Sequence, residues 1–492
     1  MSIEPFGSAT SLLQQIQSRE IRCVDALEAL WERYQAHNPE LNAIVATNIE
    51  DARKRAVEAD QALDRGESWG PLHGLPMTIK DSYEVVGMPT TSGAPQLKDY
   101  QSKKNADAVQ RLVDAGAIVF GKTNLPLFAG DWQSFNDVYG TTNNPWDRTR
   151  TPGGSSGGAA ASLAAGLTPL ELGSDIGGSI RSPAHYCGVY GHKPTYGLVS
   201  QRGHIPGPPG TKGAADLGVM GPMARYAEDL SLALDVLVGP ELDEPSPWNV
   251  LLPPSRHQRL QDFRVAVWFQ DSHCPLEPEV QESYDALLSS LEEAGVSVDT
   301  NVGEEFDMEE IHFLYLRLLG GVLGPGLPKK VYNKLRKGLP LLRLKWLFQK
   351  PAFGSDVYLQ AMLQSHRDWM SANEKRAKLR QTYMKFFQRY DVLLMPIVPW
   401  VAFPHIQEGT IFERKLQFGK RTRNYNEHLP WIGFATALGF PSTSAPLGVH
   451  EPSGLPVNVQ VVGGPYDDHT CITFARLLAE VHGGFTSPPD YR

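Results

Sequence analysis

The sequence has few cysteines, no excess of basic residues and no long hydrophobic run. No Cys-x-x-Cys pair occurs among Cys23, Cys187, Cys274 and Cys471, which favours reduced thiols over a disulfide framework. Lys and Arg total 46 against 55 Asp and Glu, whereas a nucleic-acid-binding protein is typically basic. The most apolar stretch, residues 157–172, is interrupted by Gly, Pro and Glu and is too short to span a membrane.

The first residues also lack the basic stretch and apolar core of a secretory signal. These absences together predict a cytoplasmic protein with no transmembrane segment and no nucleic-acid partner. The chain of 492 residues, with 41% hydrophobic and 21% charged residues, has the composition of a folded protein with a substantial core.

Helix and strand patterns alternate along the chain. Apolar residues recur at helical spacing over residues 8–64, and a short apolar run at 75–79 predicts a buried strand that ends at Lys80. Two later units repeat a helical stripe, a glycine and a strand, at 109–120 and 280–298. With further strand candidates at 265–269 and 392–395, this alternation predicts an α/β fold.

Two serines are embedded in glycine. Ser155 lies in TPGGSSGG at 151–158, and Ser179 lies in GSDIGGSIR at 173–181. Serine needs a base to act as a nucleophile, and glycine N–H groups can approach a developing oxyanion closely. A flexible linker is disfavoured because the intervening residues 159–172 are apolar and favour a helix.

Other interpretations of these glycines fit less well. Ser155 and Ser156 both match G-x-S-x-G, but the preceding segment is polar and carries two prolines where a nucleophile elbow needs a strand. A phosphate-binding loop would need Gly-Lys-Ser/Thr after the glycines. No zinc spacing is formed by His185, Cys187 and His192, so we predict no metal. Histidine or lysine remains as the base, and burial at the end of a strand would depress the pKa of Lys80.

Four segments together resemble the amidase signature family, in the family's order and spacing. They read GLPMTIKD at 74–81, TPGGSSGG at 151–158, GSDIGGSIRSPA at 173–184 and CGVYGHKPT at 187–195. The resemblance covers residues 72–239 and resumes at ATALGFP (435–441) and GLPVNVQVVG (454–463). It implies an amidase signature fold, in which a large mixed, twisted β-sheet is covered by α-helices on both faces.

The resemblance also assigns roles to individual residues. Ser179 matches the acyl-forming nucleophile, Ser155 matches a bridging serine that follows a cis peptide bond, and Lys80 matches the base. The backbone N–H groups of Ile176, Gly177, Gly178 and Ser179 match the oxyanion hole, with isoleucine at 176 where threonine is common in bacterial members. The implied reaction is hydrolysis of a carboxylic amide, with ester or carbamate hydrolysis as a side activity and without a cofactor.

Supporting roles follow for neighbouring residues. We expect hydrogen bonds and an ion pair to hold the nucleophile turn through Ser174, Asp175 and Arg181. The resemblance implies that one wall of the substrate pocket is formed by a segment that follows residues 121–126 and contains Ala129, Gly130, Asp131 and Trp132.

The chain divides into four segments of one continuous amidase domain. We predict an N-terminal helical segment at 1–65, the signature core at 66–240, a variable helical and pocket region at 241–430, and a return to the core at 431–492. Residues 329–350 hold eight Lys or Arg and no Asp or Glu, which is typical of a solvated helix pair packed on the core. Contact with an anionic membrane surface is the alternative.

Two other functions stay open beside the amidase. One is the glutaminase subunit of a tRNA-dependent amidotransferase, and the other is a binding protein that kept the fold without its activity. The expected partner is a small-molecule amide substrate, and a homodimer is also considered.

Overall fold

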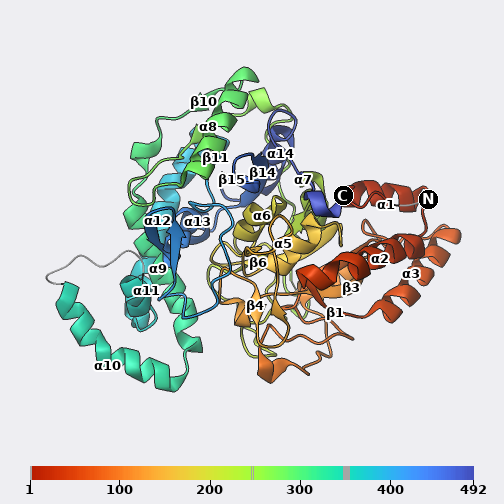
Figure 1. The fold of residues 1–492 in the computed structure, drawn as a ribbon, viewed down its shortest axis with the longest axis horizontal. Coiled ribbons are helices and arrows are strands. Elements are labelled where there is room, and N and C mark those ends of the chain that lie inside the picture. The colour runs from red at the N-terminus through yellow and green to blue at the C-terminus, as the bar shows by residue number, and fades with distance from the viewer. Residues whose placement is uncertain (1–2, 245, 248, 347–354) are drawn as a thin grey trace.

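An eleven-stranded mixed sheet runs through the protein (Figure 1). The computed structural model describes residues 3–244, 246–247, 249–346 and 355–492. The strand order is β1-β3-β2-β6-β8-β7-β14-β15-β11-β9-β10. In chain order these strands are β1 (Ile44–Thr47), β2 (Pro76–Lys80), β3 (Ile118–Thr123), β6 (Leu170–Asp175), β7 (Tyr190–Lys193), β8 (Val219–Ala224), β9 (Val265–Val267), β10 (Val298–Asp299), β11 (Val392–Pro396), β14 (Ser442–His450) and β15 (Leu455–Val462).

The strand directions bring the two glycine-rich serine segments near Lys80. β2 pairs in parallel with both β3 and β6, and the carboxyl ends of parallel strands lie at one edge of a sheet. Lys80 ends β2, and Asp175 ends β6 just before the Ser179 loop. Two short ribbons, β4 (Phe135–Asn136) with β5 (Gly140–Thr141) and β12 (Lys415–Phe418) with β13 (Arg421–Asn424), lie outside the large sheet.

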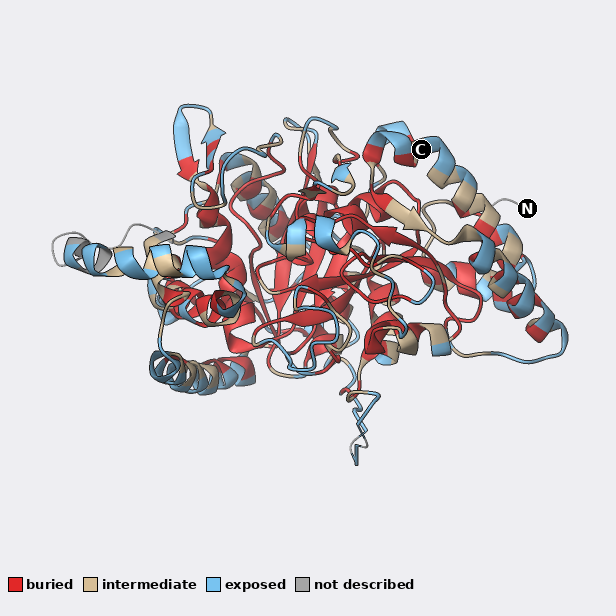
Figure 2. Cartoon of the chain, turned by 90° about the horizontal axis from the view of Figure 1, so that it is seen from below, coloured by how far each residue is buried: buried red, intermediate tan, exposed pale blue. Residues whose placement is uncertain are grey.

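Helices pack on both faces of the sheet. In β8, the side chain of Met223 joins a core cluster with residues of α5 and α6, whereas Met220 and Ala224 join the largest cluster with residues of α4, α7 and α14. Alternate residues of a strand point to opposite faces, so these helices lie on opposite sides. Figure 2 shows the buried centre and the more exposed outer helices. The structure confirms the predicted α/β class and the large mixed sheet covered by helices.

The helices are α1 (Ala9–Gln17), α2 (Cys23–Leu41), α3 (Ile49–Asp64), α4 (Asp107–Asp114), α5 (Gly157–Ala164), α6 (Arg181–Cys187), α7 (Ala227–Leu237), α8 (Pro278–Glu293), α9 (Met308–Leu323), α10 (Lys329–Trp346), α11 (Ser355–Ala361), α12 (His366–Arg389), α13 (Leu429–Leu438) and α14 (Asp468–Leu478). Each of the four predicted segments of the chain contributes at least one strand to the large sheet. The boundaries between the segments stay predictions.

Two local expectations differ from the structure. The N-terminal region is not purely helical, because β1 lies between α2 and α3 and pairs with the edge of β3. The apolar stretch 159–172 is helical only as far as Ala164, and its second half begins β6. A short apolar run that is buried on all sides has the same pattern in a helix and in a central strand, which explains the second difference.

The basic segment is a single helix that extends away from the body of the protein. α10 spans Lys329–Trp346, and Figure 1 shows it reaching outward from the region of α9 and α11. The expectation of a helix pair packed on the core is therefore wrong for residues 329–346. Residues 347–350 of that segment lie outside the described residues.

Candidate active site

The side chain of Lys80 is fully buried and surrounded by serine hydroxyls. Its Nζ lies 2.7 Å from the Oγ of Ser155, 2.9 Å from that of Ser156 and 3.0 Å from that of Ser174. β2 delivers the lysine, the segment before α5 delivers Ser155 and Ser156, and β6 delivers Ser174. The sequence associates Lys80 with Ser155 and Ser179. Of these two serines, Ser155 is the one whose hydroxyl is hydrogen bonded to the lysine.

Burial controls the charge of this lysine. Desolvation lowers the pKa of Lys80 to about 7, and the negative charges of Asp175 and Glu171 oppose part of that shift. Burial disfavours the charged form of an amine because the ammonium loses its hydration. Lys80 is therefore a neutral amine with a free lone pair once the pH exceeds about 7.

Ser155 lies at a point where two backbone segments approach closely. A cis peptide bond joins Gly154 to Ser155. A Cβ on Gly154 would lie 2.6 Å from the carbonyl oxygen of Asp131 and 2.7 Å from the nitrogen of Gln133. These distances are shorter than real side-chain carbons reach, so only glycine fits at position 154 and the segment 131–133 packs directly against the Ser155 turn.

The loop that carries Ser179 is organised by a buried ion pair. Asp175 accepts hydrogen bonds from the backbone N–H groups of Gly178 and Ile180 at 2.9 and 3.1 Å, and it pairs with Arg181 at 2.9 Å. Burial opposes ionisation of Asp175, but the Arg181 charge outweighs it and holds the pKa of the carboxyl at about 2. Arg181 also donates to Gln460 Oε1 at 2.6 Å, which anchors the loop to β15.

Two aromatic side chains fix the carbonyl groups of the same loop. The Tyr315 hydroxyl, on α9, donates to the carbonyl oxygen of Ile176 at 2.7 Å. Trp132 Nε1 donates to the carbonyl oxygen of Gly177 at 3.0 Å. In a trans peptide the C=O and the following N–H point in opposite directions. These two bonds therefore set the directions of the next two N–H groups.

The predicted oxyanion donors do not all have the same surroundings. The N–H of Gly178 already donates to Asp175. Within the described part of the chain, no backbone carbonyl accepts a hydrogen bond from the N–H groups of Ile176, Gly177 or Ser179. Of the four amides predicted from the sequence, these three are consequently available to a ligand.

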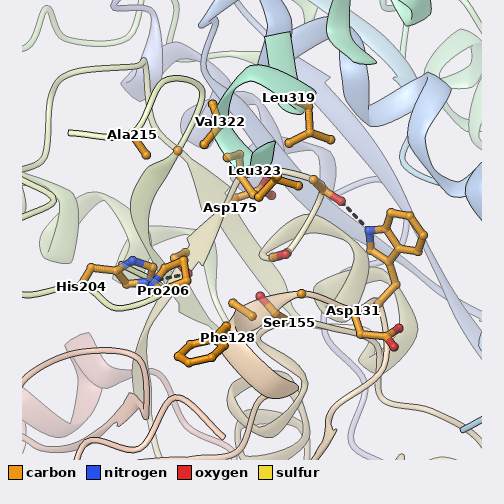
Figure 3. A pocket seen from close by; sticks show the side chains of 18 of the residues that line it. Phe128, Asp131, Ser155, Asp175, His204, Pro206, Ala215, Leu319, Val322 and Leu323 are labelled. Atoms are coloured by element: carbon orange, nitrogen blue, oxygen red, sulfur yellow. Dashed lines mark hydrogen bonds between the residues drawn. The ribbon is translucent and has the colours of Figure 1, made fainter. Parts of the chain in front are cut away.

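Ser155 and Ser179 line one pocket, shown in Figure 3. The N–H of Ser156 donates to the carbonyl oxygen of Ser179 at 3.1 Å, which ties the two serine segments together. The predicted wall residues Ala129, Gly130, Asp131 and Trp132 all line this pocket, as do Ser174 and Asp175.

Most of the remaining pocket surface is apolar. Its other side chains include Phe128, Met220, Leu319, Val322, Leu323 and Leu429. Among the described lining residues, the carboxylates belong to Asp131 and Asp175. Asp131 pairs with Arg414 and accepts a hydrogen bond from the Tyr425 hydroxyl at 2.6 Å, so both carboxylates are already compensated.

Several residues at the site were not predicted. His204, Tyr315 and Arg414 come from a Gly/Pro-rich loop, from α9 and from the segment before β12. None lies in a motif, and their sequence neighbours carry no signal for a site. Their proximity follows from how distant segments pack.

No group of three or more potential metal ligands occurs within the described residues. His185, Cys187 and His192 are buried, and both ring nitrogens of each histidine lie within hydrogen-bond distance of protein groups. Among the helices that the structure describes, none is both long and apolar enough to cross a bilayer.

Comparison with known proteins agrees with this architecture. A family model described as Amidase matches residues 25–472. Fatty-acid amide hydrolase 2 of Homo sapiens is 31% identical, with 98% of this chain and 90% of that protein covered. A glutamyl-tRNA(Gln) amidotransferase subunit of Carboxydothermus hydrogenoformans is also 31% identical, with coverage of 96% and 97%.

A solved structure described as an amidase matches with a TM-score of 0.75 at 28% identity, covering 97% of this chain and all of that one. The family match and these relatives span nearly the whole sequence. The chain therefore belongs to the amidase signature family and is a hydrolase of carbon–nitrogen bonds.

Proposed function

We propose that this protein hydrolyses neutral amides with an apolar acyl group through an acyl-enzyme on Ser179. Ser155 relays the proton, and neutral Lys80 is the base. The 2.7 Å distance between Lys80 Nζ and Ser155 Oγ supports this assignment. The lowered pKa of Lys80, about 7, supports it further because an amine must be neutral to accept a proton.

In the proposed reaction, Ser179 Oγ forms a bond to the amide carbonyl carbon. Its proton passes to Ser155 while the Ser155 proton passes to Lys80 Nζ. The proton then returns by the same route to the amide nitrogen as the C–N bond breaks and the amine leaves. Water adds to the acyl-enzyme, which releases the acid and regenerates Ser179.

The developing oxyanion would be held by backbone N–H groups. Ile176, Gly177 and Ser179 supply the amides that lack a protein acceptor, and Gly178 could contribute only by sharing the hydrogen that it donates to Asp175. Donors fixed before the reaction need no reorganisation in the transition state. Tyr315 and Trp132 would act as positioning residues by holding the neighbouring carbonyls.

The pocket lining carries the proposal about the substrate. Its side chains are mostly apolar, and the two described carboxylates in it are paired or hydrogen bonded. Burying an uncompensated charge in such a site is costly. A neutral amide with an alkyl or aryl acyl group fits these surroundings, and esters or carbamates of the same shape would also fit.

Glutamine is the second candidate substrate, because glutamyl-tRNA(Gln) amidotransferase subunits are among the relatives. Its α-ammonium and α-carboxylate groups would need charged partners, and the described lining offers no uncompensated one. A partner protein would also be required for amide transfer.

Kinetics with two kinds of substrate separate these candidates. The first is a series of p-nitroanilides from acetyl to decanoyl, and the second is L-glutamine with ammonia as the readout. We expect kcat/KM to rise with acyl length and glutamine turnover to stay at the level of the Ser179→Ala control. Ser179-dependent ammonia release from glutamine, without anilide hydrolysis, would overturn the proposed substrate class.

We also propose that α10 contacts anionic membrane surfaces. The helix contains seven Lys or Arg and no Asp or Glu, and it projects outward (Figure 1). Val331, Tyr332, Leu341 and Leu344 are exposed apolar side chains on it. Basic and apolar side chains on one exposed helix favour binding in the interface of anionic lipid.

Sedimentation with vesicles tests the α10 proposal. We expect binding to phosphatidylserine-containing vesicles, loss of that binding in Lys330→Glu/Lys334→Glu/Lys337→Glu, and no binding to pure phosphatidylcholine. If equal fractions of wild type and variant sediment with the anionic vesicles, the proposal that α10 binds the membrane is rejected. We further propose a cytoplasmic location, which four free, buried cysteines support. A homodimer stays a prediction, which analytical ultracentrifugation can test by measuring the mass of the protein in solution.

A further inference from the structure

The hydrogen bonds around Lys80 have a direction that the proposed mechanism requires. A neutral amine has two N–H donors and one lone pair, and Lys80 Nζ lies within 3.0 Å of three hydroxyls. To take a proton from Ser155, the lone pair must point at that hydroxyl. The other two hydroxyls, those of Ser156 and Ser174, must then accept the two N–H groups.

Ser156 has its own acceptor. Its hydroxyl donates to the backbone carbonyl oxygen of Ser174 at 3.4 Å. Because a hydroxyl has only one hydrogen, a Ser156 that donates to this carbonyl can only accept from Lys80. This long contact with the backbone favours the acceptor direction for the first of the two bonds.

Ser174 needs a corresponding acceptor, and His204 lies in that position. The Nε2 atom of His204 is 3.0 Å from Ser174 Oγ, and Figure 3 shows the imidazole at one side of the pocket. The Tyr83 ring packs edge-on against it at 4.8 Å between centroids, and residues 83 and 204 form a backbone bridge. The Tyr83 hydroxyl in turn donates to the Gly173 carbonyl at 2.6 Å. The imidazole is therefore held against β6.

His204 is neutral in these surroundings. Burial, together with the nearby Lys80, lowers the pKa of His204 to about 3. A neutral imidazole has one ring nitrogen that accepts a hydrogen bond and one that donates. The Ser174 hydroxyl is hydrogen bonded to it, the Tyr83 ring packs against it and the charge of Lys80 acts on it, while Glu171 and Asp175 lie on the same strand as Ser174.

We infer that His204 is a positioning residue that accepts a hydrogen bond from the Ser174 hydroxyl and thereby directs the Lys80 lone pair toward Ser155. This inference rests on the proposed function. When the hydroxyls of Ser174 and Ser156 both accept hydrogen bonds from Lys80, both N–H groups of the neutral amine are occupied, and its lone pair faces Ser155. Without the His204 acceptor, the Ser174 hydroxyl can turn and donate to Lys80, which competes with Ser155 for the lone pair.

A double-mutant cycle with a rescue variant tests the inference. His204→Phe keeps the ring and removes the acceptor, whereas His204→Gln offers an amide oxygen near the position of Nε2. We expect His204→Phe to lower kcat about tenfold with KM within about twofold, and His204→Gln to recover most of kcat. In a Ser174→Ala background, His204→Phe should cause no further loss, because the hydroxyl that it orients is absent.

Equal kcat losses in His204→Phe and His204→Gln, or a full tenfold further loss in the Ser174→Ala background, would overturn the inference and indicate a packing or substrate-contact role. A wild-type kcat in His204→Phe would also overturn it. Thermal midpoints of all variants report folding separately. The proposed function fails by a different result, namely wild-type hydrolysis that survives Ser179→Ala.

Discussion

Two of the regions that form the site contribute different things to it. Residues 74–181 supply the buried lysine, the serines and the amides of the loop, and these groups contact one another through directed hydrogen bonds of 2.7 to 3.1 Å. Residues 308–323 in α9 mainly supply apolar surface, through Leu319, Val322 and Leu323. Under the proposed mechanism, the first region carries the reaction and the apolar part of α9 sets the fit of the substrate.

Tyr315 is the exception in α9, because its hydroxyl holds the Ile176 carbonyl at 2.7 Å. If the contrast is right, changes in the first region should lower kcat by orders of magnitude. Changes in the apolar part of the second region should alter acyl-chain preference, and Tyr315 should behave like a member of the first region.

The largest effect is expected from Lys80→Met. Loss of the base should lower kcat/KM about 10³- to 10⁴-fold, in the upper range for general base catalysis. The thermal midpoint should stay the same or rise, since a buried amine is replaced by an apolar chain of similar length. Stopped assays with an anilide substrate and calorimetry measure both.

Lys122 is the matched control for Lys80. It is also fully buried, on the neighbouring strand β3, but it pairs with Asp81 at 3.2 Å. Lys122→Met leaves that carboxylate unpaired and should destabilise the fold by about 3 to 5 kcal/mol. A loss of activity below tenfold in Lys80→Met, or a stability loss equal to that of Lys122→Met, would contradict the assigned role.

The next effect is expected from Tyr315→Phe. The Ile176 carbonyl loses its donor, and the adjacent Gly177 amide loses its fixed direction, so kcat should fall about 10- to 100-fold with a smaller change in KM. Tyr358→Phe, which alters a tyrosine that lines the pocket, serves as the control. Equal kcat values in the two variants would mean that the Tyr315 hydrogen bond does not position the loop that carries Ser179.

The pH dependence follows from the charge of Lys80. Lowering the pH protonates the amine and removes the base, so kcat/KM should fall about tenfold per unit below a pKa near 7 and level off above it. His204, with a pKa of about 3, and Asp175, with a pKa of about 2, keep one protonation state across this range. A flat profile from pH 5.5 to 9 would show that Lys80 does not titrate as the base.

The smallest effect is expected from Leu323→Ala. Removing this half-buried side chain should lower kcat/KM for a decanoyl anilide about three- to tenfold and leave the acetyl anilide nearly unchanged. Leu341→Ala, an exposed leucine on α10, should change neither value. The same loss for short and long acyl chains would mean that α9 does not line the acyl site.

The two regions also differ in how far the sequence predicted them. An apolar run marks the strand that ends at Lys80, and glycines mark the loops that hold Ser155 and Ser179. Both patterns can be recognised within a few residues of the sequence. Tyr315 contacts the Ser179 loop at Ile176, 139 residues away in the chain, and His204 contacts Ser174 of β6, 30 residues away. Such contacts depend on packing between distant segments, which one sequence does not reveal.

The same limit explains the errors in the fold. Residues 165–172 were expected to continue a helix, yet β6 begins at Leu170 because this stretch is buried between β2 and β8. For residues 329–346, the run of basic residues did not distinguish a helix pair packed on the core from one helix that projects outward.

Covalent labelling of the serine tests the central claim most directly. A fluorophosphonate should form one adduct, which peptide mass spectrometry should locate on Ser179. The adduct should be absent from Ser179→Ala and form far more slowly in Lys80→Met, where the relay through Ser155 has no base. Undiminished labelling of Ser179→Ala, or an adduct on Ser155 in the wild type, would contradict the account.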